Sequence, residues 1–172
     1  NAAHLALRYP HTIVTNSLSK SNALTGLRLG WILAPSSFVD EAIKVHAWVT
    51  SCADTFAQQV ALHIFQTPSA LREHAHWYRE RRLDLLAALH ESTLPFVQPE
   101  GSFYACVRLP EGARSLEAAN ELAERYDVIA IPGVAFGPSM EGWLRLSWVG
   151  PPERVRDGIL RIADYCASKA IA

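Results

Sequence analysis

The chain has 172 residues, of which 49% are hydrophobic and 19% are charged, and its formal net charge is -1. This composition suffices for one domain or one and a half with a sizeable core, and the balanced charge gives no indication of a nucleic-acid partner. No apolar run approaches the ~20 residues of a membrane-spanning helix, so we expect a soluble, cytoplasmic protein with no membrane partner.

The chain contains three cysteines, Cys52, Cys106 and Cys166, which are widely spaced among apolar neighbours. An odd number at such spacing is typical of reduced thiols in a cytoplasmic protein and not of a disulfide framework. We therefore predict buried thiols and no disulfide.

Two short apolar runs, His11–Thr15 and Leu29–Ala34, lie on either side of Lys20. Their β-branched and aromatic residues predict two buried strands, with the lysine on the segment between them. Functional side chains of parallel-sheet proteins commonly follow such strands.

The segment between the strands combines an amine with groups that suit a phosphate. Ser17 and Ser19 supply hydroxyl groups, and Arg28 supplies a planar fork of N–H donors that matches a dianionic phosphate. Gly26 is expected to let the backbone turn tightly before the arginine. A lone lysine would be interpreted as a solvated surface residue, but this combined pattern favours Lys20 as a reactive amine beside a phosphate-bearing aldehyde.

The strings SLSK and TGLRLGW, which contain these residues, resemble the lysine motif of class I/II aminotransferases, the aspartate aminotransferase superfamily. The resemblance implies that Lys20 holds pyridoxal 5'-phosphate covalently and acts in catalysis. It also implies that Ser17 and Arg28 bind the phosphate of the cofactor, with Ser19 joining them.

The resemblance covers nearly the whole chain, but it begins just before Lys20 and so corresponds to the second half of a family member. The first half of the family carries a phosphate loop, a ring-stacking aromatic residue and an aspartate paired with the pyridine nitrogen, for which this sequence has no counterpart. We therefore expect an α/β fragment of a PLP-dependent transferase. Residues 1–70 would be the end of the large-domain sheet with the lysine loop, 71–91 a long inter-domain helix, and 92–172 a small C-terminal α+β domain.

Three helices are predicted in the middle of the chain. Ser36 and Ser37 are expected to cap the first, a break at 51–54 separates it from a second helix at Thr55–Gln66, and Pro68 opens a third that runs to about Glu91. The resemblance implies a homodimer, in which the break reaches toward the neighbouring subunit.

Two features of this region argue against particular sites. There is no arginine between Lys44 and Arg72, which disfavours the side-chain recognition used by dicarboxylate-specific family members. His74 and His76 are two apart on a predicted helix and so point in different directions, and we predict no metal site.

The last 80 residues show the pattern of a small α+β unit. Strands are predicted at Ser102–Leu109, Val128–Ile131 and Trp143–Trp148. Ser115 is expected to cap a helix that ends near Tyr126, and a last helix opens with Pro151–Pro152.

A second candidate site residue lies in the strand Trp143–Trp148. Alternation places Arg145 on one face and Leu144 and Leu146 on the other. An arginine in so apolar a strand needs an anionic partner, and the sequence alone favours a structural ion pair with a protein carboxylate. The string IAIPGVAFG before the strand and the string RLS within it resemble the family's PG…FG turn and the strand that follows, which implies that Arg145 binds the α-carboxylate of the substrate.

The resemblance implies an aminotransferase of amino acid metabolism that moves an amino group between an amino acid and a 2-oxo acid. Two alternatives stay open: a PLP-dependent carbon–sulfur lyase, and an aminotransferase-like effector domain of a transcription regulator. We expect the chain alone to be inactive. We also expect it to self-associate, because its first strands lack sheet neighbours.

Overall fold

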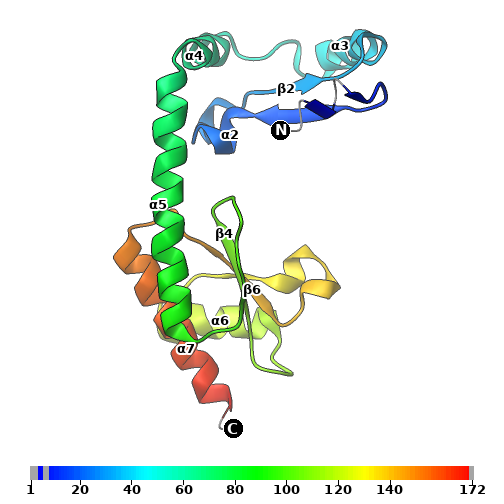
Figure 1. Ribbon diagram of the computed structural model, residues 1–172. Coiled ribbons are helices and arrows are strands. Elements are labelled where there is room, and N and C mark those ends of the chain that lie inside the picture. The colour runs from blue at the N-terminus through cyan, green and yellow to red at the C-terminus, as the bar shows by residue number, and fades with distance from the viewer. Residues whose placement is uncertain (1–3, 6–7, 171–172) are drawn as a thin grey trace. The chain divides into compact units, whose positions relative to one another are not determined.

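The computed structural model describes residues 4–5 and 8–170, which are drawn as ribbons in Figure 1. They divide into two compact units, Asn1–His76 and Trp77–Ala172. The two units are described in turn.

The first unit begins with a two-stranded antiparallel sheet. Strands β1 (Val14–Ser17) and β2 (Gly30–Leu33) pair along their whole length and are linked through the short helix α2 (Leu18–Ser21) and the 3-10 turn η1 (Thr25–Leu27). The prediction of two buried strands is wrong, because every residue of β2 is exposed and the pairing is antiparallel. The apolar residues of a strand indicate a surface that is unfavourable in water. They do not indicate whether other elements of the unit bury that surface. Among the described residues of this unit, the buried hydrophobic side chains are those of Leu18, Ala57 and Ala61.

Two helices follow, α3 (Ser36–Thr50) and α4 (Thr55–Gln66). The predicted bounds of α4 are confirmed, and the Asp54 carboxylate caps it by accepting the Ala57 N–H at 2.8 Å. The predicted serine caps of α3 are wrong: Pro35 is the N-cap residue, and its carbonyl accepts the N–H groups of Phe38 and Val39. The fixed φ of proline already directs the chain into a first turn, so no hydroxyl cap is used.

The second unit contains a four-stranded antiparallel sheet in the order β3-β4-β6-β5. Helix α5 (Pro68–Ser92) confirms the predicted long helix, and its residues belong to the first unit up to His76 and to the second from Trp77. The remaining elements are β3 (Phe96–Val97), β4 (Tyr104–Arg108), α6 (Ser115–Tyr126), β5 (Ile131–Pro132), η2 (Gly133–Phe136), η3 (Pro138–Met140), β6 (Trp143–Ser147) and α7 (Pro152–Ala170). Figure 1 shows α6 and α7 beside strands β4 and β6.

One face of this sheet builds the core of the second unit. Strands β4 and β6 alternate, so that Val107 and Leu144 are fully buried while their neighbours along the strand are not. They pack with Leu89 of α5, Leu122 of α6 and Ile162 of α7. The helices therefore cover one face of the sheet, and Arg145 lies on the other, as the alternation predicted.

Two local predictions in this unit are wrong. Only Ile131 of the predicted strand Val128–Ile131 belongs to β5, because the N–H of Val128 bonds instead to the carbonyl of Leu122 at the end of α6. Ser115 is the first residue of α6 and not its cap; its hydroxyl turns away from the helix and accepts a hydrogen bond from Val134.

The three cysteines are all free thiols, but they are less buried than predicted. Cys52 is exposed in the break between α3 and α4, whereas Cys106 and Cys166 are half-buried. Cys52 is exposed because the helices on either side of it bury few side chains: α3 buries none, and α4 buries Ala57 and Ala61.

Across the described residues, no helix combines the length and the apolar character needed to cross a bilayer. Over residues 4–5 and 8–170, no group of three or more histidine, cysteine, aspartate or glutamate side chains is placed to hold a metal ion.

Candidate functional site

The lysine segment is anchored by Leu18, the fully buried residue that opens α2. The N–H of Leu18 donates to the carbonyl of Leu29 at 3.2 Å, and its own carbonyl accepts the N–H of Leu24 at 3.2 Å. The backbone of this buried residue thus joins α2 to the residues on either side of η1. Lys20 lies two residues later, on the exposed side of this short helix.

Ser17 is the residue around which the segment is hydrogen-bonded. Its hydroxyl accepts the N–H of Ser19 at 3.3 Å, and its own N–H donates to the side-chain carbonyl of Asn16 at 2.8 Å. The hydroxyl of Ser21 donates to the Ser17 carbonyl at 3.2 Å. The sequence indicated the serines but not Asn16 or Ser21, whose bonds are local and are typical of Asx and hydroxyl turns.

Arg28 is brought to the same end of the strand pair. It follows η1 in a left-handed conformation, with φ of 50°, and its Nη1 donates to the carbonyl of Thr25 at 2.8 Å. Ser17 is the register partner of Gly30, two residues after Arg28. The structure therefore places Ser17, Lys20 and Arg28 together at one end of the β1–β2 pair.

The glycine that this arrangement requires is Gly30, and not Gly26 as predicted. A Cβ at Gly30 would lie 2.7 Å from the backbone oxygen of Asn16 and 3.3 Å from the Cβ of Ser17, whereas a Cβ at Gly26 would meet nothing within 4 Å. Gly26 also has no positive φ. The close approach of β2 to β1 beside Ser17 therefore depends on Gly30.

Gly30→Ala is expected to destabilise the first unit by about 1–3 kcal/mol, because the added methyl group meets backbone atoms that cannot move alone. Gly26→Ala is the matched control and should leave stability within about 0.5 kcal/mol. Urea unfolding followed by circular dichroism measures both. Equal midpoints for the two variants would contradict this account of β2.

The groups at this end of the strand pair fit pyridoxal phosphate in kind. Two hydroxyl groups and a guanidinium suit a phosphate, and a primary amine suits an aldehyde. Arg28 is exposed, and the bond to Thr25 uses one of its five N–H donors, so most of its fork is directed to solvent.

Arg145, in the second unit, lies against two aromatic rings. The Cζ atom of its guanidinium lies 4.1 Å from the ring centroid of Tyr104 and 4.3 Å from that of Phe136. Stacking on aromatic faces is a characteristic arrangement of arginine. Both rings therefore lie within cation–π distance of the guanidinium.

The alternative of a structural ion pair for Arg145 is not supported. None of the ion pairs found among the described residues includes Arg145, and its Nε atom is buried without a hydrogen-bond partner. The residues directly across from it in the neighbouring strands are Cys106 and Ile131, neither of which is anionic at neutral pH. Burial raises the pKa of the Cys106 thiol, so the thiol stays neutral beside the cation.

A hydrogen-bonded group that the sequence did not indicate joins the start of α6 to Val134 and Glu141, on either side of Phe136 in the chain. One carboxylate oxygen of Glu141 accepts the N–H of Ser115 at 2.6 Å and the N–H of Gly142 at 3.0 Å. The hydroxyl of Ser115, which is fully buried, accepts the N–H of Val134 at 3.2 Å. Ser115 is 26 residues from Glu141 and 19 from Val134, and a single sequence carries no signal of such pairs.

Hydrogen bonds from the backbone of Ser115, and next from that of Gly142, hold the pKa of Glu141 below its ordinary value of 4.5. A carboxyl group with a lowered pKa in the folded state stabilises that state above its unfolded pKa, and this contribution is lost as the pH falls through the folded value. We expect Glu141→Ala to lower the stability of the second unit at pH 7, and the difference from the wild type to shrink below pH 4.5. Urea unfolding at a series of pH values measures it, and a difference that does not change with pH would be the contrary result.

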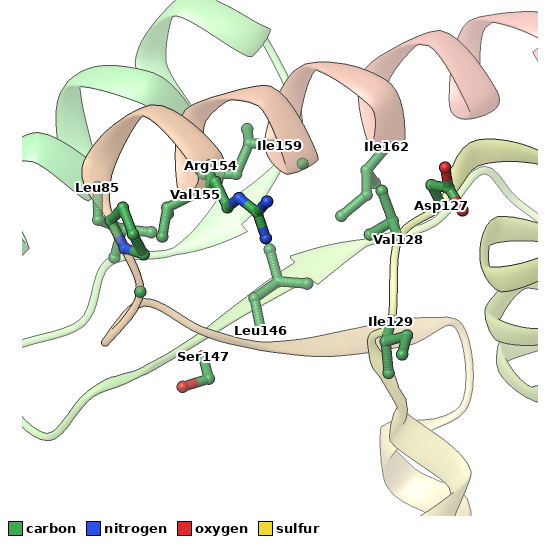
Figure 2. A pocket seen from close by; sticks show the side chains of 13 residues that line it. Leu85, Asp127, Val128, Ile129, Leu146, Ser147, Arg154, Val155, Ile159 and Ile162 are labelled. Carbon is green, nitrogen blue, oxygen red and sulfur yellow. The ribbon is translucent and has the colours of Figure 1, made fainter.

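A groove of about 380 Å³ lies elsewhere in the second unit. Figure 2 shows Arg154 and Ile159 of α7 on one side of it, with Ser147 and Ile129 on the other. Neither the lysine segment nor Arg145 lines this groove, so it is separate from the predicted site residues.

Comparison with known proteins places these observations in one family. The sequence model of the family "Aminotransferase class I and II" matches residues 2–162. The aspartate aminotransferase of Pyrococcus abyssi is 31% identical over 173 residues, covering 95% of this chain and 43% of that protein. The arginine–pyruvate transaminase of Pseudomonas aeruginosa is 32% identical over 166 residues, covering 93% and 41%.

Solved structures agree with the sequence relatives. The aromatic aminotransferase of Pyrococcus horikoshii superposes with a TM-score of 0.84 at 28% identity, covering 94% of this chain and 44% of that one. The α/β fold expected from the sequence is thus confirmed. The chain spans about two-fifths of the length of the proteins it matches, and over that length it belongs to the class I and II aminotransferase family.

Proposed function

We propose that this chain supplies the cofactor lysine, the phosphate-binding groups and the carboxylate-binding arginine of a PLP-dependent aminotransferase. Lys20 would hold the aldehyde of the cofactor, Ser17, Ser19 and Arg28 would bind its phosphate, and Arg145 would bind the carboxylate of an amino acid or a 2-oxo acid. Pyridoxal phosphate, when bound, supplies an electron sink for the bonds of the substrate's α-carbon.

Two side chains of this chain would contribute to the reaction, one as a base and one by orienting the substrate. The Lys20 amine, once released from the cofactor, is the base that moves a proton at the substrate's α-carbon. Arg145 orients the substrate, because a guanidinium and a carboxylate form two parallel hydrogen bonds in one plane.

The observation that carries the proposal is the environment of Arg145. Its guanidinium lies against the rings of Tyr104 and Phe136, and no protein carboxylate among the described residues pairs with it. Ring contacts of this kind leave the N–H edge of the guanidinium to a ligand, and a planar carboxylate fits that edge. The named relatives act on aspartate, arginine with pyruvate, and aromatic amino acids, substrates that share an α-carboxylate.

We further propose the domain assignment implied by the family. Residues 1–70 would belong to the large domain, 71–91 to the joining helix and 92–172 to the small domain. Helix α3, which has no buried residue and exposes 92% of Trp48, is proposed as part of a homodimer interface. From composition and cysteine usage we also propose a cytoplasmic location.

The function is tested by transfer of a ¹⁵N-labelled amino group from an amino acid to a 2-oxo acid, assayed with the protein that contains this chain. Transfer that is abolished by Lys20→Ala is the expected result. Pyruvate and ammonia formed from a cysteine conjugate would indicate a carbon–sulfur lyase instead. Cofactor binding without turnover of any substrate would favour a regulator domain. For the 172-residue chain alone we expect no transfer.

A further inference from the structure

The segment Gly133–Met140, here called the 133–140 loop, brings Phe136 to Arg145. The loop folds closely upon itself: a Cβ at Gly133 would collide with the backbone oxygen of Met140 and would lie 2.8 Å from that of Trp143. Within the loop, the N–H of Gly137 donates to the carbonyl of Val134 at 3.0 Å. The loop is therefore a compact unit whose position depends on how it is fastened to the rest of the fold.

Two side chains fasten the loop, one at each end. The hydroxyl of Ser115 accepts the N–H of Val134, close to its start. At its other end, the carboxylate of Glu141 accepts N–H groups from Ser115 and Gly142, which joins the end of the loop to the first turn of α6 and to the approach of β6. Both attachments meet at Ser115, which is fully buried.

The two rings that cover Arg145 are held by different means. Tyr104 belongs to β4, which pairs with β6 over its whole length, so its ring is fixed by the sheet. Phe136 belongs to the loop, and its ring, 4.3 Å from Cζ of Arg145, depends on the attachments at Ser115 and Glu141. Because the Nε atom of Arg145 is buried without a hydrogen-bond partner, no bond from Nε fixes the guanidinium plane.

We propose that Glu141 and Ser115 are positioning residues for Arg145: by fastening the 133–140 loop they hold Phe136 on the guanidinium and so set its affinity for carboxylates. The inference rests on the proposed function of Arg145 as the carboxylate-binding residue. With the loop unfastened, only a fraction of molecules present the covered guanidinium, and the apparent affinity falls by that fraction.

The test uses the 172-residue chain, ¹⁵N-labelled, with pyruvate as the probe, because its only anionic group is the carboxylate. The Nε–Hε signal of Arg145 reports the stacked rings through their ring currents before any ligand is added, and the pyruvate titration gives the dissociation constant. Phe136→Leu, which removes the ring itself, is the reference. We expect Glu141→Ala to shift the free Arg145 signal toward that of Phe136→Leu and to raise the dissociation constant about three- to ten-fold, the equivalent of one net hydrogen bond.

Three further variants make the result specific. Glu141→Gln keeps an oxygen that can accept both N–H groups and should restore the wild-type signal and affinity. Glu124→Ala removes an exposed carboxylate of α6 and should change neither. Ser115→Ala, which keeps the Glu141 bonds to backbone and removes the attachment of Val134, should behave like Glu141→Ala; it also serves if that variant does not fold.

An unchanged Arg145 signal and an unchanged dissociation constant in Glu141→Ala or Ser115→Ala would overturn the inference and leave the proposed function intact. A wild-type Arg145 signal that does not respond to pyruvate would overturn the proposed role of Arg145, and with it the claim about affinity. In that case the signals of the ligand-free variants still show whether the loop is fastened as described.

Discussion

Arg145→Lys is expected to weaken the binding of pyruvate by the chain about 100-fold, the equivalent of ~3 kcal/mol for a bidentate, charge-assisted pair. Lysine keeps the charge but has no planar fork, and it does not stack on the rings of Tyr104 and Phe136 as a guanidinium does. The backbone amide signals of Leu144 and Leu146, which flank the substituted residue, follow the titration by NMR.

Arg108→Lys is the matched control for this substitution. Arg108 lies on the same face of the sheet, over the ring of Trp143 at 5.7 Å, and is exposed. Its replacement should leave the dissociation constant for pyruvate within about two-fold, a difference of less than 0.5 kcal/mol. A similar loss in both variants would show that the effect is one of general positive charge and would contradict a specific carboxylate site at Arg145.

Arg28→Gln should lower the affinity of the chain for pyridoxal phosphate about 100-fold while leaving its affinity for pyridoxal nearly unchanged. The expected size corresponds to the loss of a charge-assisted pair with a dianionic phosphate. Pyridoxal has the same ring and aldehyde but no phosphate, so the ratio of the two affinities isolates the phosphate contact. Fluorescence quenching of the chain by each ligand gives both constants.

Lys44→Gln controls for the loss of a positive charge in the same unit. Lys44 is exposed on α3 and pairs with Glu41 at 2.7 Å, and its replacement should leave the ratio unaltered. If Arg28→Gln weakens pyridoxal and pyridoxal phosphate equally, the arginine stabilises the segment, by its bond to Thr25, and does not bind phosphate.

The features that could be predicted from the sequence are those set by local pattern. The bounds of α4 followed from the break at 51–54 and a regular apolar spacing, and the alternation in β6 placed Arg145 on the face opposite Leu144 and Leu146. Both depend on residues within one element, where helix and strand periods decide which side chains share a face.

The features that could not be predicted depend on contacts between distant residues. Serine is common at helix N-caps, so the sequence predicts Ser115 as a cap. In the fold its hydroxyl instead accepts a hydrogen bond from the N–H of Val134, 19 residues away. No pattern in the sequence singles out Glu141, whose carboxylate accepts the N–H of the first residue of α6. The apolar runs around Lys20 could not reveal that β2 is exposed, since the hydrophobicity of a strand does not show which other elements pack on it.

The central claim is that Lys20 is the residue that bonds the cofactor, and peptide mapping after borohydride reduction tests it most directly. The chain has three lysines, so the labelled peptide identifies the residue: besides Lys20 there are Lys44, which pairs with Glu41, and Lys169, whose pKa is raised by a hydrogen bond to Glu121. The chain is mixed with pyridoxal phosphate at a one-to-one ratio, reduced and digested. The account predicts label on Lys20. Label spread over Lys44, Lys169 and the terminal amine, with Lys20 no more reactive than the others, would contradict it.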